Sequence, residues 1–172
     1  GRLYFDIEEP LVYVLSKMEI AGIKVDLGCL KDFAATLRQE LLHKEAKIRE
    51  MAGEPDLNIS SPKQIGDLLF GKLSLDPKAR KTANGRYPTD EATLSALSHT
   101  NPIVDEILDF RAVKKLLSTY IEPFPSYISS VTGRVHTTFN QALTATGRLS
   151  SSNPNLQNIP IRTEKGKEIR KA

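Results

Sequence analysis

The sequence predicts an α+β protein in which a mostly helical first part is followed by a small antiparallel β segment. Before residue 122, apolar residues recur at helical spacing in several segments, and most of these segments begin with a recognisable capping residue. After Pro125 the period changes, because Val135, Thr137 and Phe139 alternate with more polar neighbours. No internal repeat is present, so we expect helices first and strands from about residue 130.

The first two helices are predicted from their apolar stripes and their ends. One helix runs from about Glu8 to Ala21, and Gly22 is a natural C-terminal stop. Residues 23–25 form a short extended piece, and Asp26 is a good N-cap for a second helix that ends near Gly53. Such a helix is about 35–40 Å long, and its narrow apolar stripe predicts an arm packed in a bundle.

A third helix is predicted from a cap followed by a proline. Ser61 is placed as N-cap, Pro62 as the first helical residue and Gln64 as the reciprocal partner of a capping box. Residues 76–88 are basic and rich in turn formers, so we expect an exposed loop there. Thr89 or Asp90 then starts a short helix that runs through Leu97.

Asn101 and Pro102 repeat the same start signal and open a longer helix that ends near Glu122. Within it, Asp105 and Asp109 share one face at a spacing of four residues. We interpret this pair as part of a solvated face near basic residues, not as a metal site.

The last part of the chain is predicted to be a hairpin and a loop. Thr132–Gly133 is a turn signal before the alternating strand 135–140, and a second extended piece is expected at about 148–150. Residues 151–160 are rich in Ser, Asn and Pro and are expected to be irregular.

Composition and charge set broad limits. The chain has 172 residues, 40% hydrophobic and 26% charged, which is ordinary for a globular protein with one or two small domains. Its apolar runs are far shorter than the about 20 residues that span a bilayer, so we expect no membrane partner and a cytoplasmic location. The single cysteine, Cys29, excludes an internal disulfide and gives no zinc cluster.

The net charge of +3 does not by itself require a polyanionic partner. Basic residues gather in 60–90 and in 161–172, and charge alone favours two solvated surfaces there.

The segment Thr144–Pro160 carries the chemistry that the rest of the chain lacks. It holds an arginine, several hydroxyls and several side-chain amides, but no paired nucleophile and base. The nearby His136 is interpreted as a strand surface residue. Donors of these types suit the acceptors that every base pair presents in the minor groove. The alternative is that these side chains only form hydrogen bonds with the backbone of their own loop. The spacing leaves both interpretations open.

This segment resembles the signature of the DNA polymerase I family, family A, which reads T-x-T-G-R-L-S-S, two residues, then P-N-L-Q-N-I-P. The match runs without a gap from Thr144 to Pro160 and continues at Arg162, Gly166, Ile169 and Arg170.

Further segments resemble the same family in the same order, over nearly the whole chain. These are 7–26, 58–70 and 107–120, and two departures, Pro88 and Leu117, put individual phosphate contacts in doubt. The resemblance implies that residues 1–25 begin the polymerase domain with a palm-proximal helix. It makes residues 26–122 the helical thumb, and residues 123–172 the first palm strands and the duplex-binding loop.

The resemblance also implies roles. The thumb of this family holds the minor groove and backbone of the primer–template duplex, and Arg148 matches an arginine that contacts the primer side near the growing end. Asn155, Gln157 and Asn158 match a polar cluster against the duplex, and Lys63 and Lys115 match basic thumb positions. The implied DNA-binding residues are Arg148, Thr144, Thr146, Ser150, Ser151, Asn155, Gln157, Asn158, Arg162, Lys63 and Lys115.

The parent protein is therefore expected to be a DNA-directed DNA polymerase, a nucleotidyltransferase of DNA replication and repair. Its partners would be primer–template duplex DNA and deoxynucleoside triphosphates, with two Mg²⁺ ions held by aspartates expected beyond residue 172. The segment alone is predicted to be non-catalytic, with no catalytic residue, metal site or cofactor of its own. The alternative is a stand-alone helical module that binds DNA or a protein.

Overall fold

The α+β class is confirmed by a computed structural model, which describes residues 7–146, 148–159 and 164–172. The chain forms two compact units: Gly1–Ala34 with Ser118–Ala172, and Ala35–Leu117. Each unit is described by itself. The predicted division of the chain at residues 25 and 122 stays a prediction.

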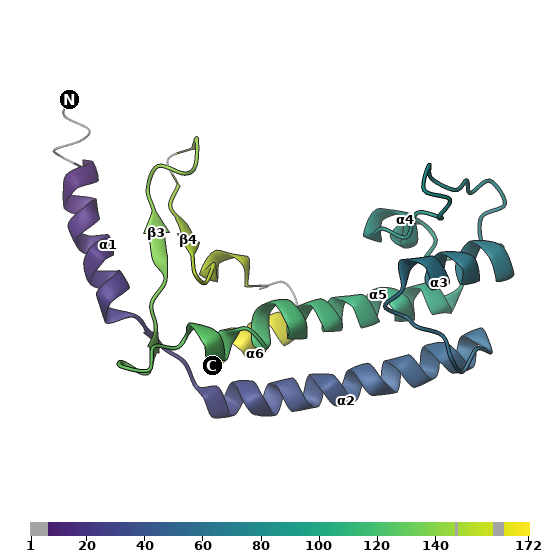
Figure 1. Ribbon diagram of the computed structural model, residues 1–172, viewed down its shortest axis with the longest axis horizontal. Helices are drawn as coiled ribbons and strands as arrows, with labels where there is room; N and C mark the ends of the chain where they lie inside the picture. Colours follow the sequence, from purple (N-terminus) through teal and green to yellow (C-terminus); the bar gives the residue numbers. More distant parts are fainter. Residues whose placement is uncertain (1–6, 147, 160–163) are drawn as a thin grey trace. The chain divides into compact units, whose positions relative to one another are not determined.

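The unit Ala35–Leu117 is helical and contains the greater part of the long helix α2. In Figure 1, α2 runs beside α5 within this unit. Lys47 of α2 lies 2.8 Å from Glu106 of α5, and Lys44 lies 3.8 Å from Asp109. The elements are α2 (Leu27–Ala52), α3 (Pro62–Gly66), the π-helix η2 (Asp67–Lys72), α4 (Glu91–Ala96) and α5 (Pro102–Lys115), after which the π-helix η3 (Leu116–Ile121) leaves the unit.

One apolar cluster forms the core of this unit. It is built by the inner faces of the helices together with the connection between α2 and α3, and partly buried residues of the 76–88 loop pack against it. Its buried members are Ile48, Ala52, Leu57, Ile59, Ile65, Leu68, Leu69, Phe70, Leu94, Ile103, Val104, Ile107 and Phe110.

The predicted helix starts are confirmed, with one correction. Asn101 and Asp90 cap α5 and α4 through side-chain oxygens, and the Ser61 hydroxyl accepts from the Gln64 amide N–H. The reciprocal half of the predicted capping box is wrong, because Gln64 Oε1 accepts from the backbone N–H of Asn58 (2.8 Å). Gln64 therefore closes the preceding turn instead of the first turn of its own helix.

The other unit combines short helices with two antiparallel two-stranded sheets. β1 pairs with β2, with Ile23 opposite Val135, and β3 pairs with β4, with Phe139 opposite Ser151. Its elements are α1 (Glu9–Ala21), β1 (Ile23–Lys24), η4 (Phe124–Tyr127), β2 (Arg134–Val135), β3 (Thr138–Asn140), β4 (Ser150–Ser152), η5 (Leu156–Asn158) and α6 (Glu164–Lys171).

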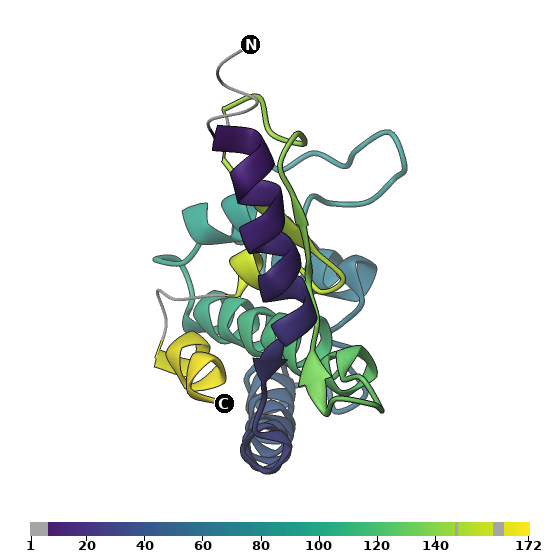
Figure 2. The same ribbon diagram turned by 90° about the vertical axis from the view of Figure 1, so that its left-hand side faces the viewer.

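The predicted continuous strand 135–140 is wrong, because it is divided between β2 and β3 at residues 136–137. His136, interpreted from sequence as a surface residue, is half-buried and its Nδ1 donates to the Glu19 carbonyl of α1 (2.7 Å). Arg134 donates to the Ala21 carbonyl (2.9 Å). Arg134 and His136 thus bond the last carbonyls of α1, and the strand is interrupted at residues 136–137. Figure 2 shows α1 alongside β3.

Gly22 makes this junction possible. Its φ of 64° is a left-handed conformation that glycine adopts at little cost. A Cβ atom at this position would lie 2.7 Å from Cε1 of His136 and 2.9 Å from the carbonyl oxygen of Val135. The end of α1 and the end of β2 can therefore touch only because residue 22 has no side chain.

The C-terminal helix α6 was not predicted. Ile169 and Gly166 are its buried residues, and charged residues make up most of the rest. Lys167 lies 2.5 Å from Glu164, and Lys171 pairs with Glu168. Among the described residues, no helix combines the length and the apolar character needed to cross a membrane.

Candidate nucleic-acid interface

The site segment, residues 137–159, is positioned by the β3–β4 hairpin and by the turn that follows β4. Thr137 is buried, and its hydroxyl faces two carbonyl oxygens, those of Ser152 (3.1 Å) and Pro154 (2.8 Å). The Asn153–Pro154 peptide bond is cis. One buried hydroxyl therefore connects the residue before β3 to the turn after β4.

Several polar side chains of the segment serve the loop itself. Ser151 is only 4% exposed, and its Oγ accepts from the Leu156 N–H (3.1 Å). Asn155 Oδ1 accepts from the Gln157 N–H (3.0 Å), and Gln157 Nε2 donates to the Leu149 carbonyl (2.7 Å). These contacts favour the loop-satisfying interpretation for the three side chains, and the burial of Ser151 leaves it little access to DNA.

Other candidates remain available to a ligand. Arg148, Thr146 and Asn158 are exposed, and their side chains make no hydrogen bond or ion pair with the described residues. Thr144 is half-buried and donates from its hydroxyl to the Arg148 carbonyl, so it binds the backbone that carries the arginine. The Ser150 hydroxyl is buried and has no hydrogen-bond partner in the described part of the chain.

The remaining candidates lie apart from this segment. Lys63 and Lys115 belong to α3 and to the end of α5, in the unit Ala35–Leu117, and both are exposed. Arg162 lies outside the described residues. Roles for all these side chains in binding DNA stay predictions.

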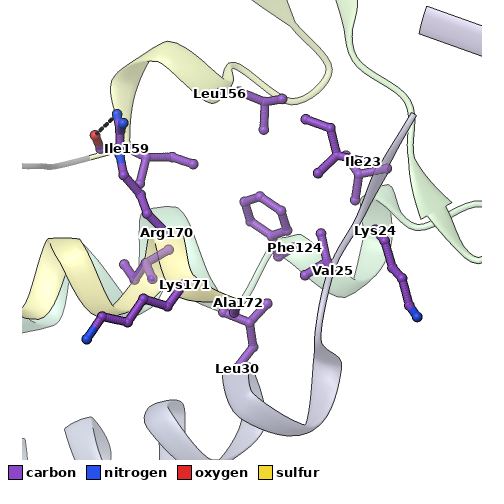
Figure 3. A pocket seen from close by; sticks show the side chains of 12 residues that line it. Ile23, Lys24, Val25, Leu30, Phe124, Leu156, Ile159, Arg170, Lys171 and Ala172 are labelled. Carbon is purple, nitrogen blue, oxygen red and sulfur yellow. Dashed lines mark hydrogen bonds between the residues drawn. The ribbon is translucent and has the colours of Figure 1, made fainter. Parts of the chain in front are cut away.

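An apolar pocket of about 440 Å³ lies beside the segment Leu156–Ile159. Figure 3 shows Leu156 and Ile159 pointing into it together with Phe124, while Arg170 donates to the Ile159 carbonyl (3.2 Å). Gln157, between the two apolar side chains, is exposed. The 3-10 helix η5 is therefore two-sided: Leu156 points into the pocket, while Gln157 and Asn158 are exposed.

The structure also shows a basic surface that sequence analysis located only as a region. The basic loop, Asp76–Pro88, exposes Lys78, Arg80, Lys81 and Arg86, and none of them forms an ion pair with the described residues. The signal in the sequence was the density of Lys and Arg between turn formers. These cations are candidate phosphate contacts alongside Lys63 and Lys115.

A metal centre is not formed by the described residues. Nowhere in this part of the chain do three or more His, Cys, Asp or Glu side chains come together, and Asp109 is 3.8 Å from Lys44. The side chains present here do not fit a two-metal site, so we derive no step through Mg²⁺.

The family model for DNA polymerase family A matches residues 28–172. The chain belongs to DNA polymerase family A. Among curated relatives, DNA polymerase I of Synechocystis sp. is 51% identical over 168 residues, which are 97% of this chain and 17% of that protein. Thermostable DNA polymerase I of Thermus aquaticus is 45% identical over 170 residues, 99% of this chain and 20% of that protein.

A solved structure of this family has the same fold. It is the POL domain of Pol1 from M. smegmatis in complex with DNA primer-template and dNTP, with a TM-score of 0.80 and 40% identity. The likeness covers 95% of this chain and 28% of that one. The chain thus spans about a fifth of the length of the curated family A polymerases it matches.

Proposed function

We propose that this chain is the part of a family A DNA-directed DNA polymerase that holds the primer–template duplex. It grips the minor groove and the phosphates without reading sequence. The observation that carries the proposal is the gap-free signature Thr144–Pro160, which includes an exposed Arg148 whose backbone carbonyl accepts from the Thr144 hydroxyl. The structural relative that was solved with primer-template and dNTP supports it.

The chemistry of the exposed side chains suits this task. A guanidinium offers five donors in a fixed fork and keeps its charge, so Arg148 can bond minor-groove acceptors beside a phosphate-rich backbone. Those acceptors occupy similar places in every correct pair, which makes the contact independent of sequence. Thr146 and Asn158 add neutral donors, while Lys63, Lys115 and the basic loop supply phosphate contacts.

Synthesis itself belongs to the full-length polymerase. That protein would use deoxynucleoside triphosphates and two Mg²⁺ ions on carboxylates outside this chain, in the cytoplasm, during replication or repair. The 172-residue chain would bind duplex DNA but would not extend a primer.

The test is a titration of the 172-residue chain against fluorescein-labelled duplexes of two unrelated sequences. Fluorescence anisotropy at two salt concentrations should show weak binding, equal for both sequences and weaker at the higher salt. Sequence-selective or salt-insensitive binding would contradict the proposal. A parallel assay with Mg²⁺, nucleotides and a primed template should give no extension, and detectable extension would show that the chain carries its own active site.

A further inference from the structure

The basic loop, Asp76–Pro88, concentrates charge on a segment without regular secondary structure. It carries four cations against one aspartate, 4 − 1 = +3. A loop that is free to move would lose conformational entropy on meeting a rigid duplex, which weakens binding. A fixed loop avoids that loss, so whatever fixes this loop contributes to binding.

The tip of the loop is closed by its own backbone. The Thr82 N–H donates to the Arg86 carbonyl (2.7 Å), and the Gly85 N–H donates to the Thr82 carbonyl (2.8 Å). The Thr82 hydroxyl also donates to the Arg86 carbonyl (3.0 Å). Gly85 has φ 69°, which the turn requires. These bonds hold the tip together but do not attach it to the helices.

An aromatic contact attaches the far end of the loop. The Tyr87 ring lies 5.1 Å from that of Phe70 in η2, and Lys81 Nζ lies 5.3 Å from the centre of the Tyr87 ring. Gly66 of α3 leaves room for this packing, since a Cβ there would lie 3.2 Å from Tyr87 Cβ.

Arg111 of α5 holds the same end through the backbone. Its guanidinium donates to the carbonyl of Thr89, a buried residue just before Asp90, the N-cap of α4. Burial lowers the pKa of the Arg111 guanidinium and the Asp90 carboxylate opposes that effect, so the side chain stays charged. The half-buried guanidinium therefore binds the backbone carbonyl of the residue that directly follows the loop.

We propose that Arg111 is a positioning residue that fixes the basic loop, through the Thr89 carbonyl, in the form that contacts phosphates. It acts through the loop and does not itself touch DNA. This inference rests on the proposed function, because it assumes that the exposed cations of the loop meet a duplex.

A double-mutant cycle on the 172-residue chain tests it. The loop-neutral variant replaces the loop cations by glutamine: Lys78→Gln, Arg80→Gln, Lys81→Gln and Arg86→Gln. Arg111→Met, which keeps a long apolar stem, is made in both backgrounds. Duplex affinity is measured by fluorescence anisotropy over a series of salt concentrations.

In the native background, Arg111→Met should weaken binding about threefold to tenfold, the effect of one lost hydrogen bond, and should flatten the salt dependence. In the loop-neutral background it should change affinity less than about twofold, because contacts that act through one another are not additive. An equal loss in both backgrounds would overturn the inference. If the loop-neutral variant binds like the native chain, the proposed phosphate contacts of the loop fail instead.

A second measurement reports the mobility of the basic loop in the absence of DNA. A fluorophore on Asn84→Cys, in a Cys29→Ser background, reports the mobility of the tip. Arg111→Met should lower its anisotropy, and Arg111→Lys, which keeps one charged donor, should restore most of it. If Arg111→Met does not fold, Arg111→Gln, whose shorter and uncharged side chain also loses the bond to Thr89, carries the same cycle. Unchanged tip anisotropy in Arg111→Met would contradict the positioning role.

Discussion

The unit Ala35–Leu117 and the site segment 137–159 are stabilised by different forces. In the unit, apolar side chains from five helical elements meet in one cluster, in which Leu69 and Ile107 are fully buried. In the site segment, Thr137, Ser151 and Gln157 bond backbone groups of the same segment.

The difference has a functional consequence. Apolar burial depends mainly on area, so it stabilises a helical arm strongly without fixing individual atoms finely. Hydrogen bonds contribute less each, but their direction fixes the backbone from which Arg148 extends. Substitutions in the two regions should therefore change different measured quantities.

The largest effect is expected in the apolar cluster. Leu69→Ala removes a fully buried side chain, and the cavity left behind should lower the free energy of unfolding by about 2–5 kcal/mol. Leu42→Ala is the matched control, because Leu42 is 66% exposed and should cost less than about 0.5 kcal/mol. Urea denaturation of both variants measures this, and equal losses would break the comparison.

In the site segment, Arg148→Ala should alter function and leave stability unchanged. In the full-length polymerase, loss of a charged hydrogen bond worth about 1.5–3 kcal/mol should lower primer extension roughly tenfold to a hundredfold. Duplex affinity should fall much less, since the contact is realised mainly in the transition state.

Steady-state extension kinetics and a melting curve on the same protein check this. Normal extension per folded molecule would rule out the role assigned to Arg148. A lowered melting temperature with a proportionate loss of extension would make it a structural residue.

A smaller effect is expected at Thr137. Thr137→Val keeps the shape but removes the one hydroxyl donor that the Ser152 and Pro154 carbonyl oxygens share. The bond to Pro154 is buried, so its loss should cost about 1–2 kcal/mol. Thr137→Ser keeps the hydroxyl and should cost less. Thermal unfolding combined with hydrogen exchange of residues 150–158 would show the loss concentrated there. Equal destabilisation by valine and serine would mean that packing, not the hydrogen bond, matters.

The smallest effect concerns pH. The hydrogen bond from Lys47, helped by the charge of Lys44, holds the pKa of Glu106 below its ordinary value of 4.5. This stability is present above that value and is lost as the pH falls through the lower pKa of the folded state. Solvent reaches the pair, so the loss should stay below about 1 kcal/mol.

Denaturation at pH 6 and pH 3 should therefore show a slightly smaller pH dependence for Glu106→Gln than for the native chain. Identical pH dependence in both proteins would mean that this ion pair contributes nothing to folding.

Local signals explain how much of the structure could be predicted. Asn101 and Asp90 cap their helices within a few residues, so these starts could be read directly from the sequence. The division of the strand at His136 could not, because its partner Glu19 is far away in the sequence. Helix α6 carries little apolar periodicity to reveal it, since it is held by charged pairs and by Ile169.

Sequence analysis named the candidate site residues by type, and their roles in binding DNA stay predictions. Sequence analysis named Arg148 and Asn158 among the candidates, and both are exposed in the structure. It could not separate them from Ser151 and Gln157, whose side chains turn back to the loop, because that choice depends on backbone direction around β4 and η5. The role of Arg111 could not be found from the sequence, since the Thr89 carbonyl that it binds lies 22 residues away in the chain.

Gly22 sets a limit on how this chain can vary. In a saturation-mutagenesis library of this chain selected for folding, codon 22 should return glycine alone. Alanine would already require both a left-handed backbone and the displacement of the His136 ring. Gly53 also has a positive φ, but apart from its chain neighbours no described residue has a heavy atom within 4 Å of an added Cβ, so asparagine should survive selection there. Tolerance at the two codons therefore measures steric exclusion separately from backbone strain.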